Sequence, residues 1–184
     1  MEQQQRQEAG TVAIVGRQYC FPHSKEYVIK KIFSFSGGDY NVTDTHGNLF
    51  FNVEGRYFSL TRKRLLLDAS GRPLLSLKRK VYSMHDTWQA FLGDSISNGQ
   101  QLFTLKKSSV FQFKTSLDVF LAHNNTGVPD FNIKGKSRAT IYHHNQVVAQ
   151  VKRKRSVYVY PGIDSAFIIS LVVIMDELQQ IKRA

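Results

Sequence analysis

The stretch Ala166-Phe-Ile-Ile-Ser-Leu-Val-Val-Ile-Met175 decides the fold of this chain. A Pro-Gly turn precedes it, and Asp164 or Ser165 can cap the N-terminus of a helix that begins there. Lys182 and Arg183 follow it and suit a helix C-terminus, where cations are favoured. A membrane span, a strand and a helix all compete for this stretch.

Length decides between these three structures. The 13 residues from Ile163 to Met175 would cover only about 20 Å as a helix, against a hydrocarbon core of about 30 Å. The β-branched residues favour a strand, but a ten-residue run without alternation exceeds the usual buried strand. We predict a helix over residues 164–180. Because it is apolar all round, it must be buried on all sides, in the lumen of a β structure.

The rest of the chain has the pattern of short strands joined by tight turns. Residues 39–54 and 65–80 each contain a D-x-x-G turn, with Gly47 and Gly71 free to adopt positive φ. A weaker third hairpin covers residues 140–154. Further strands are predicted at residues 11–15, 27–35, 87–92, 102–106, 110–114, 117–121, 131–134 and 156–160. These strands are enough to close a barrel, which would also remove exposed sheet edges.

Composition limits the class of protein. At 184 residues, the chain fits one domain, which we place at residues 11–184 after a disordered tail at residues 1–10. The only cysteine is Cys20, which suits a reducing compartment. The sequence shows no signal peptide or lipid-anchor motif, so we predict a cytoplasmic protein, with the membrane surface and the nucleus as further locations. The 25 Lys and Arg against 14 Asp and Glu give a net charge of +11, which favours anionic partners.

Three stretches resemble the plant LURP-one-related proteins: Ser83-Met-His-Asp-Thr-Trp88, Lys114-Thr-Ser-Leu-Asp-Val-Phe-Leu121 and Tyr160 to Asp176. The resemblance implies a tubby-like fold, in which a closed antiparallel β-barrel of twelve strands encloses a hydrophobic C-terminal helix. It also implies kinship with phospholipid scramblases and tubby-type membrane-tethered transcription factors, and a link to plant defence. It implies no catalytic activity, and we predict that the protein is not an enzyme and has no cofactor. The chain departs from the family pattern after Gly135, where a short Lys136-Ser-Arg-Ala139 replaces a longer insertion, so no ligand role is carried onto that loop.

Ser83, His85 and Asp86 resemble part of a hydrolase triad. However, neighbours along a strand point to opposite faces of the sheet, and the chain has no nucleophile elbow. We therefore expect a polar cluster that orients Trp88 at a rim of the barrel.

Two other pairs of side chains lack a partner that their chemistry requires. Cys20 and His23 could form a nucleophile and base, but they lie near the start of the chain and no third group can be named. His143 and His144 are adjacent and would need a ligand from another strand to hold a metal ion. We predict no metal site.

Acidic residues flank the predicted helix, but the segment between them is apolar and lacks the oxygen ligands of a calcium site. Helix capping accounts for Asp164, and we expect Asp176 and Glu177 to be exposed. Gly37-Gly38 is not followed by the Lys-Ser or Lys-Thr of a phosphate-binding loop, so we interpret it as a hairpin turn.

Runs of basic residues are the strongest remaining signal. Successive side chains of a strand point to opposite faces of the sheet, so a run of adjacent basic residues would place at least one charge in the barrel lumen. Because an apolar lumen cannot accept Lys, these runs must lie where the strands emerge at a rim. The runs are Arg62-Lys63-Arg64, Lys78-Arg79-Lys80, Lys106-Lys107 and Lys152-Arg153-Lys154-Arg155.

These basic runs have several interpretations. They can simply be solvated and protect strand edges. All but Lys106-Lys107 are assigned to a composite site for anionic membrane lipid, such as a phosphoinositide, which is our preferred function. A nuclear DNA-associated factor and a protein-interaction scaffold are the alternatives. Against nucleic acid, no recognition helix, zinc finger or RNA-recognition motif is apparent.

Overall fold

A computed structural model describes residues 10–32, 39–56, 63–80, 86–95, 99–108, 116–152 and 155–181, without the side chains of Arg56, Gln180 and Ile181. A 3-10 turn, η1 (Arg17–Tyr19), precedes the strands, and one helix, α1 (Ser165–Ile181), follows them. The strands are β1 (Lys25–Ile32), β2 (Asp39–Asp44), β3 (Leu49–Arg56), β4 (Lys63–Asp68), β5 (Pro73–Arg79), β6 (Trp88–Leu92), β7 (Gln101–Lys107), β8 (Ser116–Leu121), β9 (Phe131–Gly135), β10 (Ala139–His143), β11 (Gln146–Val151) and β12 (Ser156–Val159).

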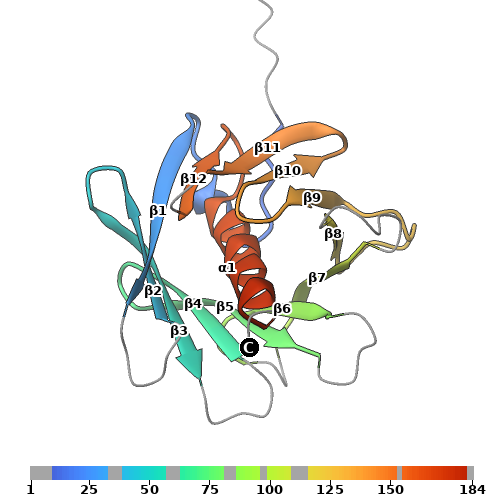
Figure 1. Cartoon of the computed structure of the whole chain (residues 1–184), viewed down its shortest axis with the longest axis horizontal. Coiled ribbons are helices and arrows are strands. Elements are labelled where there is room, and N and C mark those ends of the chain that lie inside the picture. Colours follow the sequence, from blue (N-terminus) through green and yellow to red (C-terminus); the bar gives the residue numbers. More distant parts are fainter. Residues whose placement is uncertain are drawn as a thin grey trace, which may run out of the picture.

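The twelve strands form one closed antiparallel barrel in which every strand pairs with its neighbours in sequence. The barrel closes where β12 returns to β1, with Lys25 opposite Val159 and Val28 opposite Ser156. Figure 1 shows α1 running through the middle of the barrel, surrounded by strands. The predicted barrel around a C-terminal helix is therefore confirmed.

The core consists of alternate strand residues and the helix that they surround. The inward side chains are large and fully enclosed, as with Tyr27, Phe103 and Phe131. All residues of α1 from Ser165 to Met175 are buried, so the helix has no solvent-exposed face in this part. Two aromatic rings from the strands on either side of β8 meet the helix at Phe167, whose ring centroid lies 5.2 Å from that of Phe103 and 4.8 Å from that of Phe131.

The Asp164 carboxylate caps the N-terminus of α1 and also binds the segment at residues 14–16. Asp164 Oδ1 accepts the backbone N–H of Phe167 at 3.1 Å, which confirms the predicted N-cap. Asp164 Oδ2 accepts the N–H groups of Ile14, Val15 and Gly16 at 3.0, 2.7 and 3.0 Å. The side chain is fully buried, so these bonds supply the contacts that water would otherwise make.

The strand predicted over residues 11–15 is wrong. Val12 makes only an isolated bridge to Ile163. Three successive N–H groups converge on one oxygen of Asp164, and this requires a bent backbone rather than an extended one. The segment therefore covers the N-terminal end of α1 instead of extending the barrel.

The predicted D-x-x-G hairpins are confirmed. Gly47 has φ 90° and Gly71 has φ 84°. Each turn is held by its aspartate, which accepts N–H groups two and four residues further on, at 2.9 Å from His46 and Asn48 to Asp44 in the first turn. The hairpin between β10 and β11 uses two residues with positive φ, His144 and Asn145, at 45° and 68°.

Some predictions lie outside the described residues. These are most of the tail at residues 1–10, the end of the strand at residues 27–35, the Gly37-Gly38 turn and the strand at residues 110–114.

Candidate functional site

The topology brings separated basic stretches to one end of the barrel. In an antiparallel barrel of consecutive strands, the connections β1–β2, β3–β4, β5–β6, β7–β8, β9–β10 and β11–β12 all lie at the same end. The last turn of α1 is also at this end, because Asp176 contacts Tyr40 of β2 and Glu177 contacts Arg64 of β4. The sequence runs therefore meet at one rim.

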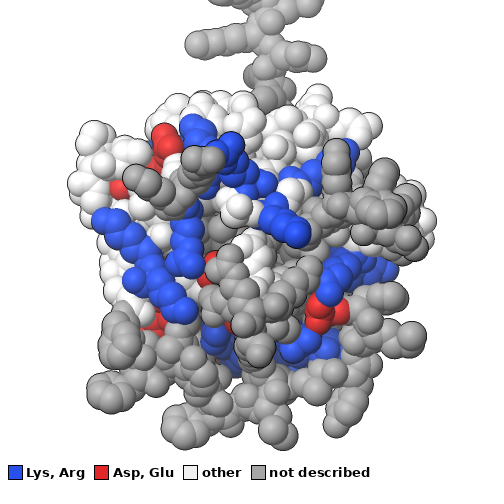
Figure 2. Space-filling model, in the orientation of Figure 1, with Lys and Arg blue, Asp and Glu red and all other residues white. Residues whose placement is uncertain are grey.

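We call this end the basic rim and define it by its Lys and Arg side chains. Those that the structure describes, apart from the buried Arg64, are Lys30, Lys31, Lys63, Lys78, Arg79, Lys80, Lys106, Lys107, Lys134, Lys136, Arg138, Lys152 and Arg155. Figure 2 shows Lys and Arg spread over the visible face, with few Asp and Glu among the described residues there.

The opposite end of the barrel is different. Among side chains that the structure describes, only Arg17, Lys25 and Arg72 are basic and lie towards that end. Arg72 pairs with Asp68 at 3.0 Å in an exposed turn, and Lys25 lies 4.8 Å from the ring centroid of Phe21. Among the described side chains, the positive charge is therefore concentrated at one end of the barrel.

Asp86 organises part of the inner edge of the rim. Its carboxylate accepts the Arg79 guanidinium at 2.6 Å and also pairs with Lys107. These hydrogen bonds, the Lys107 bond above all, lower the pKa of Asp86. Trp88 is fully buried just inside. Asp86 is thus an ion-pair centre, while Ser83 and His85 of the hydrolase-like pattern lie outside the described residues.

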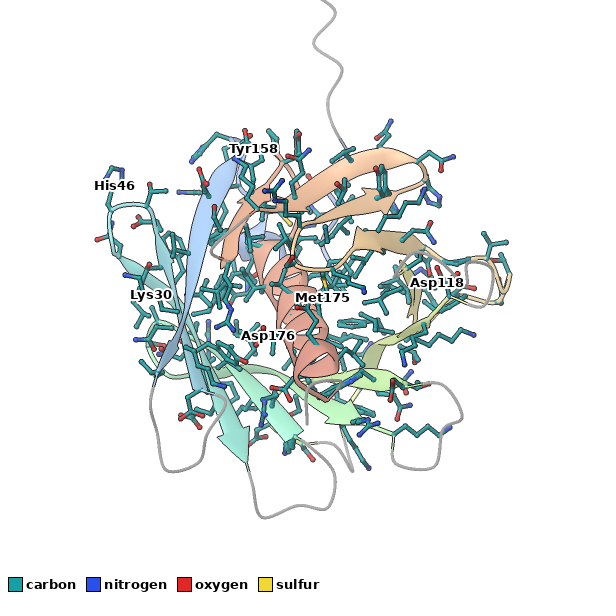
Figure 3. The ribbon with its side chains drawn as sticks, in the orientation of Figure 1. Lys30, His46, Asp118, Tyr158, Met175 and Asp176 are labelled. Carbon is teal, nitrogen blue, oxygen red and sulfur yellow. The ribbon has the colours of Figure 1, made fainter. Side chains whose placement is uncertain are left out.

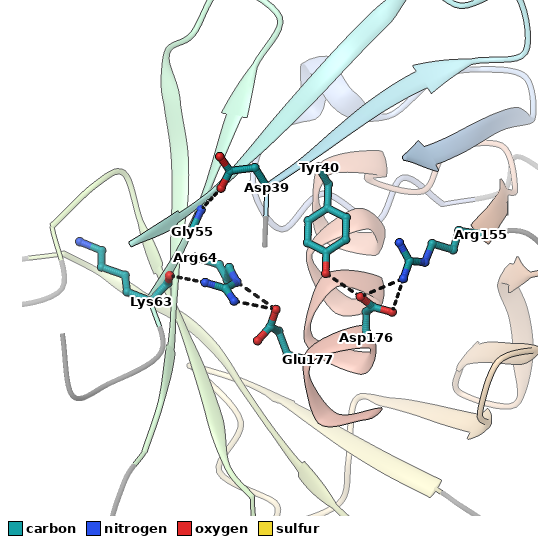
Figure 4. Close-up of polar contacts among 8 residues, drawn as sticks. All are labelled: Asp39, Tyr40, Gly55, Lys63, Arg64, Arg155, Asp176 and Glu177. Carbon is teal, nitrogen blue, oxygen red and sulfur yellow. Dashed lines mark hydrogen bonds and ion pairs between the residues drawn. The ribbon is translucent and has the colours of Figure 1, made fainter. Parts of the chain in front are cut away.

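The C-terminal end of α1 corrects two predictions (Figure 4). Asp176 and Glu177 were expected to be exposed, but Glu177 is fully buried, with its Oε1 at 3.0 Å from Nε and 2.9 Å from Nη2 of Arg64. Arg64 was assigned to the exposed lipid site, yet its side chain is only 6% exposed. Arg64 points inward because β4 places it on the same parity as Leu66, and its charge is accepted inside because Glu177 neutralises it.

Asp176 makes a second polar contact beside the first. The hydroxyl of Tyr40 donates to Asp176 Oδ2 at 2.5 Å, and Nη2 of Arg155 lies 3.2 Å from Oδ1. Both acidic residues therefore join the helix end to the barrel wall. Cations stabilise the C-terminus of a helix. In the described part of the chain, these cations lie on the barrel and not on α1 itself.

The other residues assigned to the lipid site have varied surroundings. Lys63 donates to the backbone oxygen of Asp94 at 2.8 Å on the outer wall. Lys80 is exposed, and Lys78 is half-buried. Lys152 is exposed, with its Nζ 5.1 Å from the ring centroid of Tyr158. Arg62, Arg153 and Lys154 lie outside the described residues.

Sequence reasoning missed several rim cations. Lys30 and Lys31 lie near the end of β1, and Lys134 lies near the end of β9. Lys136 and Arg138 belong to the β9–β10 turn. All five are exposed. None belongs to a run of three or more basic residues, which is the feature shared by the residues that were assigned to the lipid site. In a barrel of consecutive antiparallel strands, every second connection lies at the same end. Once the strand order is known, this rule identifies the basic residues that share the rim.

Cys20 and His143, the remaining candidates for chemistry, both lie in packed surroundings. Burial raises the pKa of the Cys20 thiol to about 11, and its Sγ lies 3.6 Å from the Val12 carbonyl oxygen, so the thiol is the favoured form at neutral pH. His143 stacks on Phe131 with ring centroids 4.6 Å apart, and burial lowers its pKa. In the described part of the chain, no three His, Cys, Asp or Glu side chains gather as a metal site would require.

The geometry defines a class of protein: a closed twelve-stranded barrel built around a C-terminal helix, with cations gathered at the end where the helix stops. The sequence model of the LURP-one-related family matches residues 25–176. Protein LURP-one-related 15 of Arabidopsis thaliana is 41% identical over 196 aligned residues, covering 96% of this chain and 90% of the relative. Protein LURP-one-related 10 is 38% identical, covering 92% and 97%. The chain belongs to the LURP-one-related family.

A solved structure supports the same fold. The X-ray structure of an Arabidopsis thaliana protein superposes with a TM-score of 0.75 at 36% identity, over 91% of this chain and 98% of that one. Within the residues described here, the chain offers no helix whose length and apolarity would suffice to cross a membrane. This agrees with the length argument for Ala166 to Met175.

Proposed function

We propose that this protein is a non-enzymatic module that docks reversibly on anionic membrane lipid, phosphoinositides included, through the basic rim. The observation that carries the proposal is the convergence of basic residues from separate hairpins on one end of the barrel. Solvation alone would not require that the cations share one end. The resemblance to tubby and scramblase proteins favours a membrane role only by analogy.

The rim also offers cations that are not neutralised nearby. In the described part of the chain, Lys30, Lys31, Lys80, Lys136 and Arg138 form none of the ion pairs found. Each basic side chain near a charged leaflet contributes about 1 kcal/mol. Four such residues together would give about 4 kcal/mol, roughly a thousandfold in affinity before salt screening. This is enough for reversible surface binding.

Vesicle co-sedimentation tests the proposal. The vesicles are phosphatidylcholine alone, or with phosphatidylserine, or with phosphatidylinositol bisphosphate, at two salt concentrations. The double variant Lys136→Gln/Arg138→Gln removes two exposed rim charges. It should weaken binding to anionic vesicles by about 30-fold at low salt, since each charge is worth about 1 kcal/mol.

The matched control is Arg17→Gln/Arg72→Gln, which removes two exposed charges from the opposite end. This variant should bind like the wild type. Equal losses in the two variants, or equal binding of the wild type to neutral and anionic vesicles, would contradict docking through the rim. Tight binding to duplex DNA with a steep salt dependence would instead support the nucleic-acid function.

The proposal extends to location and to plant defence. A fluorescent fusion of the wild type should concentrate at the inner face of the plasma membrane, and the rim variant should spread through the cytoplasm. If the rim variant also fails to restore pathogen resistance in a plant lacking the gene, while the control variant succeeds, docking and defence are linked. An unchanged distribution of the rim variant would refute this extension.

A further inference from the structure

The barrel wall has a notch at the basic rim, beside the C-terminal half of α1. β12 has only four residues, and its pairing with β1 stops at Val28 opposite Ser156. Residues 29–32 of β1 therefore extend past the described part of β12. A cavity of about 280 Å³ lies at this place and is open to solvent on one side.

The inner wall of the cavity is apolar. It is formed by Ile29 of β1, Val151 of β11 and the helix residues Val172, Val173 and Met175. All five side chains belong to the buried core. Figure 3 labels Met175 on the helix, inside the ring of strands. Such a wall favours hydrocarbon over water.

The mouth of the cavity is polar and carries more positive than negative charge. Lys136 and Arg155 line it, together with Asp176. Arg155 pairs with Asp176 at 3.2 Å and adopts φ 60°, an unusual conformation for a residue other than glycine. Lys136 is exposed and belongs to no ion pair found among the described residues. The mouth therefore favours an anion.

We propose that this cavity binds one aliphatic chain of an anionic amphiphile, with the chain on the apolar wall and the anionic head at Lys136 and Arg155. The cavity of about 280 Å³ and its apolar inner wall suit part of one aliphatic chain rather than a whole lipid. The chain can come from a soluble amphiphile or from a membrane lipid. The second source rests on the proposed docking function.

Methyl NMR can test the cavity directly. The chain has three methionines, and Met175→Leu assigns the resonance of the one that lines the cavity. Decyl phosphate, added below its critical micelle concentration, should shift this resonance saturably. Inorganic phosphate should leave it unchanged, and decyltrimethylammonium should bind at least tenfold more weakly.

Three variants separate cavity binding from binding elsewhere on the protein. Val172→Phe fills part of the apolar wall and should weaken decyl phosphate binding at least tenfold. Val128→Phe makes the same change at a side chain that is 65% exposed in the β8–β9 connection, and should leave binding unchanged. Lys136→Glu changes an exposed side chain and should therefore fold. It tests the cavity mouth even if Val172→Phe does not fold. It should weaken decyl phosphate binding and strengthen decyltrimethylammonium binding.

The outcomes are distinct. Loss of vesicle binding in Val172→Phe along with decyl phosphate binding identifies a membrane lipid as the source, while loss of decyl phosphate binding alone identifies a soluble amphiphile. The inference is overturned if decyl phosphate gives no saturable shift, if a folded Val172→Phe binds it like the wild type, or if Lys136→Glu has no effect. The docking function is judged separately on vesicles by Lys80→Gln/Arg138→Gln, because both side chains are exposed rim cations and neither lines the cavity.

Discussion

Asp164 connects the start of the described chain to its end. One carboxylate oxygen caps α1 and the other holds the three N–H groups of residues 14–16. These three residues precede Asp164 by 148 to 150 positions in the sequence. A residue that could be interpreted as an ordinary N-cap therefore also fixes the N-terminal segment over the end of the barrel.

We predict that Asp164→Ala lowers the free energy of unfolding by about 3–4 kcal/mol. Loss of the N-cap accounts for about 1 kcal/mol, and each backbone N–H left without its acceptor adds about 1 kcal/mol. Urea denaturation measures the change. Asp44→Ala serves as the control, because Asp44 holds an exposed turn in a similar way, and its loss should be clearly smaller. Similar losses in both variants would contradict the double role of Asp164.

Cys20 gives a prediction on reactivity. Burial raises the pKa of its thiol to about 11, with the Asp164 carboxylate adding to the effect. The thiolate is the reactive form, so the rate of alkylation by iodoacetamide in the folded protein should rise tenfold per pH unit from pH 7 to about pH 10. A rate that levels off near pH 8.5, the value for an ordinary cysteine, would show that burial does not control this thiol.

At the scale of elements, the end of α1 differs from an ordinary exposed helix end. Among the described residues of α1, the last turn has no basic side chain. The barrel supplies cations instead, with Arg64 on Glu177 and Arg155 on Asp176. The helix is thus fixed by hydrophobic contact along its length and by charge at its end.

We predict that removal of one partner of the Arg64–Glu177 pair is far more damaging than removal of both. Arg64→Met or Glu177→Met alone should lower the free energy of unfolding by about 3–5 kcal/mol, because a buried charge is left without its partner. The double variant should recover most of this loss, since two apolar side chains fit an apolar lumen. A double-mutant cycle by chemical denaturation measures the coupling. Additive losses in the double variant would show that the two charges do not depend on each other.

How much of the fold could be predicted depends on how local each signal is. The helix over residues 164–180 and the turns at Gly47 and Gly71 follow from a few adjacent residues, and the structure confirms them. The bend at residues 11–15 was missed because its cause, Asp164, is far away in sequence. An apolar pattern in that segment could not reveal a distant acceptor.

The same reason explains what was missed at the candidate site. The inward position of Arg64 depends on the register of β4 and on Glu177, more than a hundred residues further on. Strand parity alone could predict that one charge of a basic run faces inward. It could not show that an acidic residue of α1 would accept that charge, so both partners were expected at the surface.

At the scale of the whole molecule, the charge is asymmetric. The chain carries a net charge of +11, and its described cations gather at the rim rather than over the whole surface. Like charges held together repel one another, which opposes the compact state. The arrangement that favours an anionic surface therefore has a cost in stability when no anion is bound.

We predict that salt stabilises the free protein. Raising the ionic strength from about 0.01 to 0.1 M shortens the Debye length from about 30 to 10 Å and screens repulsion across the rim. The melting temperature should rise by about 2–4 °C, which corresponds to about 1 kcal/mol in a chain of this size. Lys136→Gln/Arg138→Gln should melt higher at low salt and respond less to salt than Arg17→Gln/Arg72→Gln. A melting temperature that falls with salt would contradict the repulsion.

The position of α1 in the chain has a consequence for biosynthesis. It is the last described element that the ribosome makes, yet it fills the centre of the barrel. Until it emerges, twelve strands have apolar inner faces with nothing to pack against, so we expect the barrel to close only after α1 has been made. Before α1 emerges, these exposed strands are prone to aggregation, and we expect chaperones to shield them. A premature stop codon just before Ser165 would yield an aggregating chain rather than a smaller folded domain.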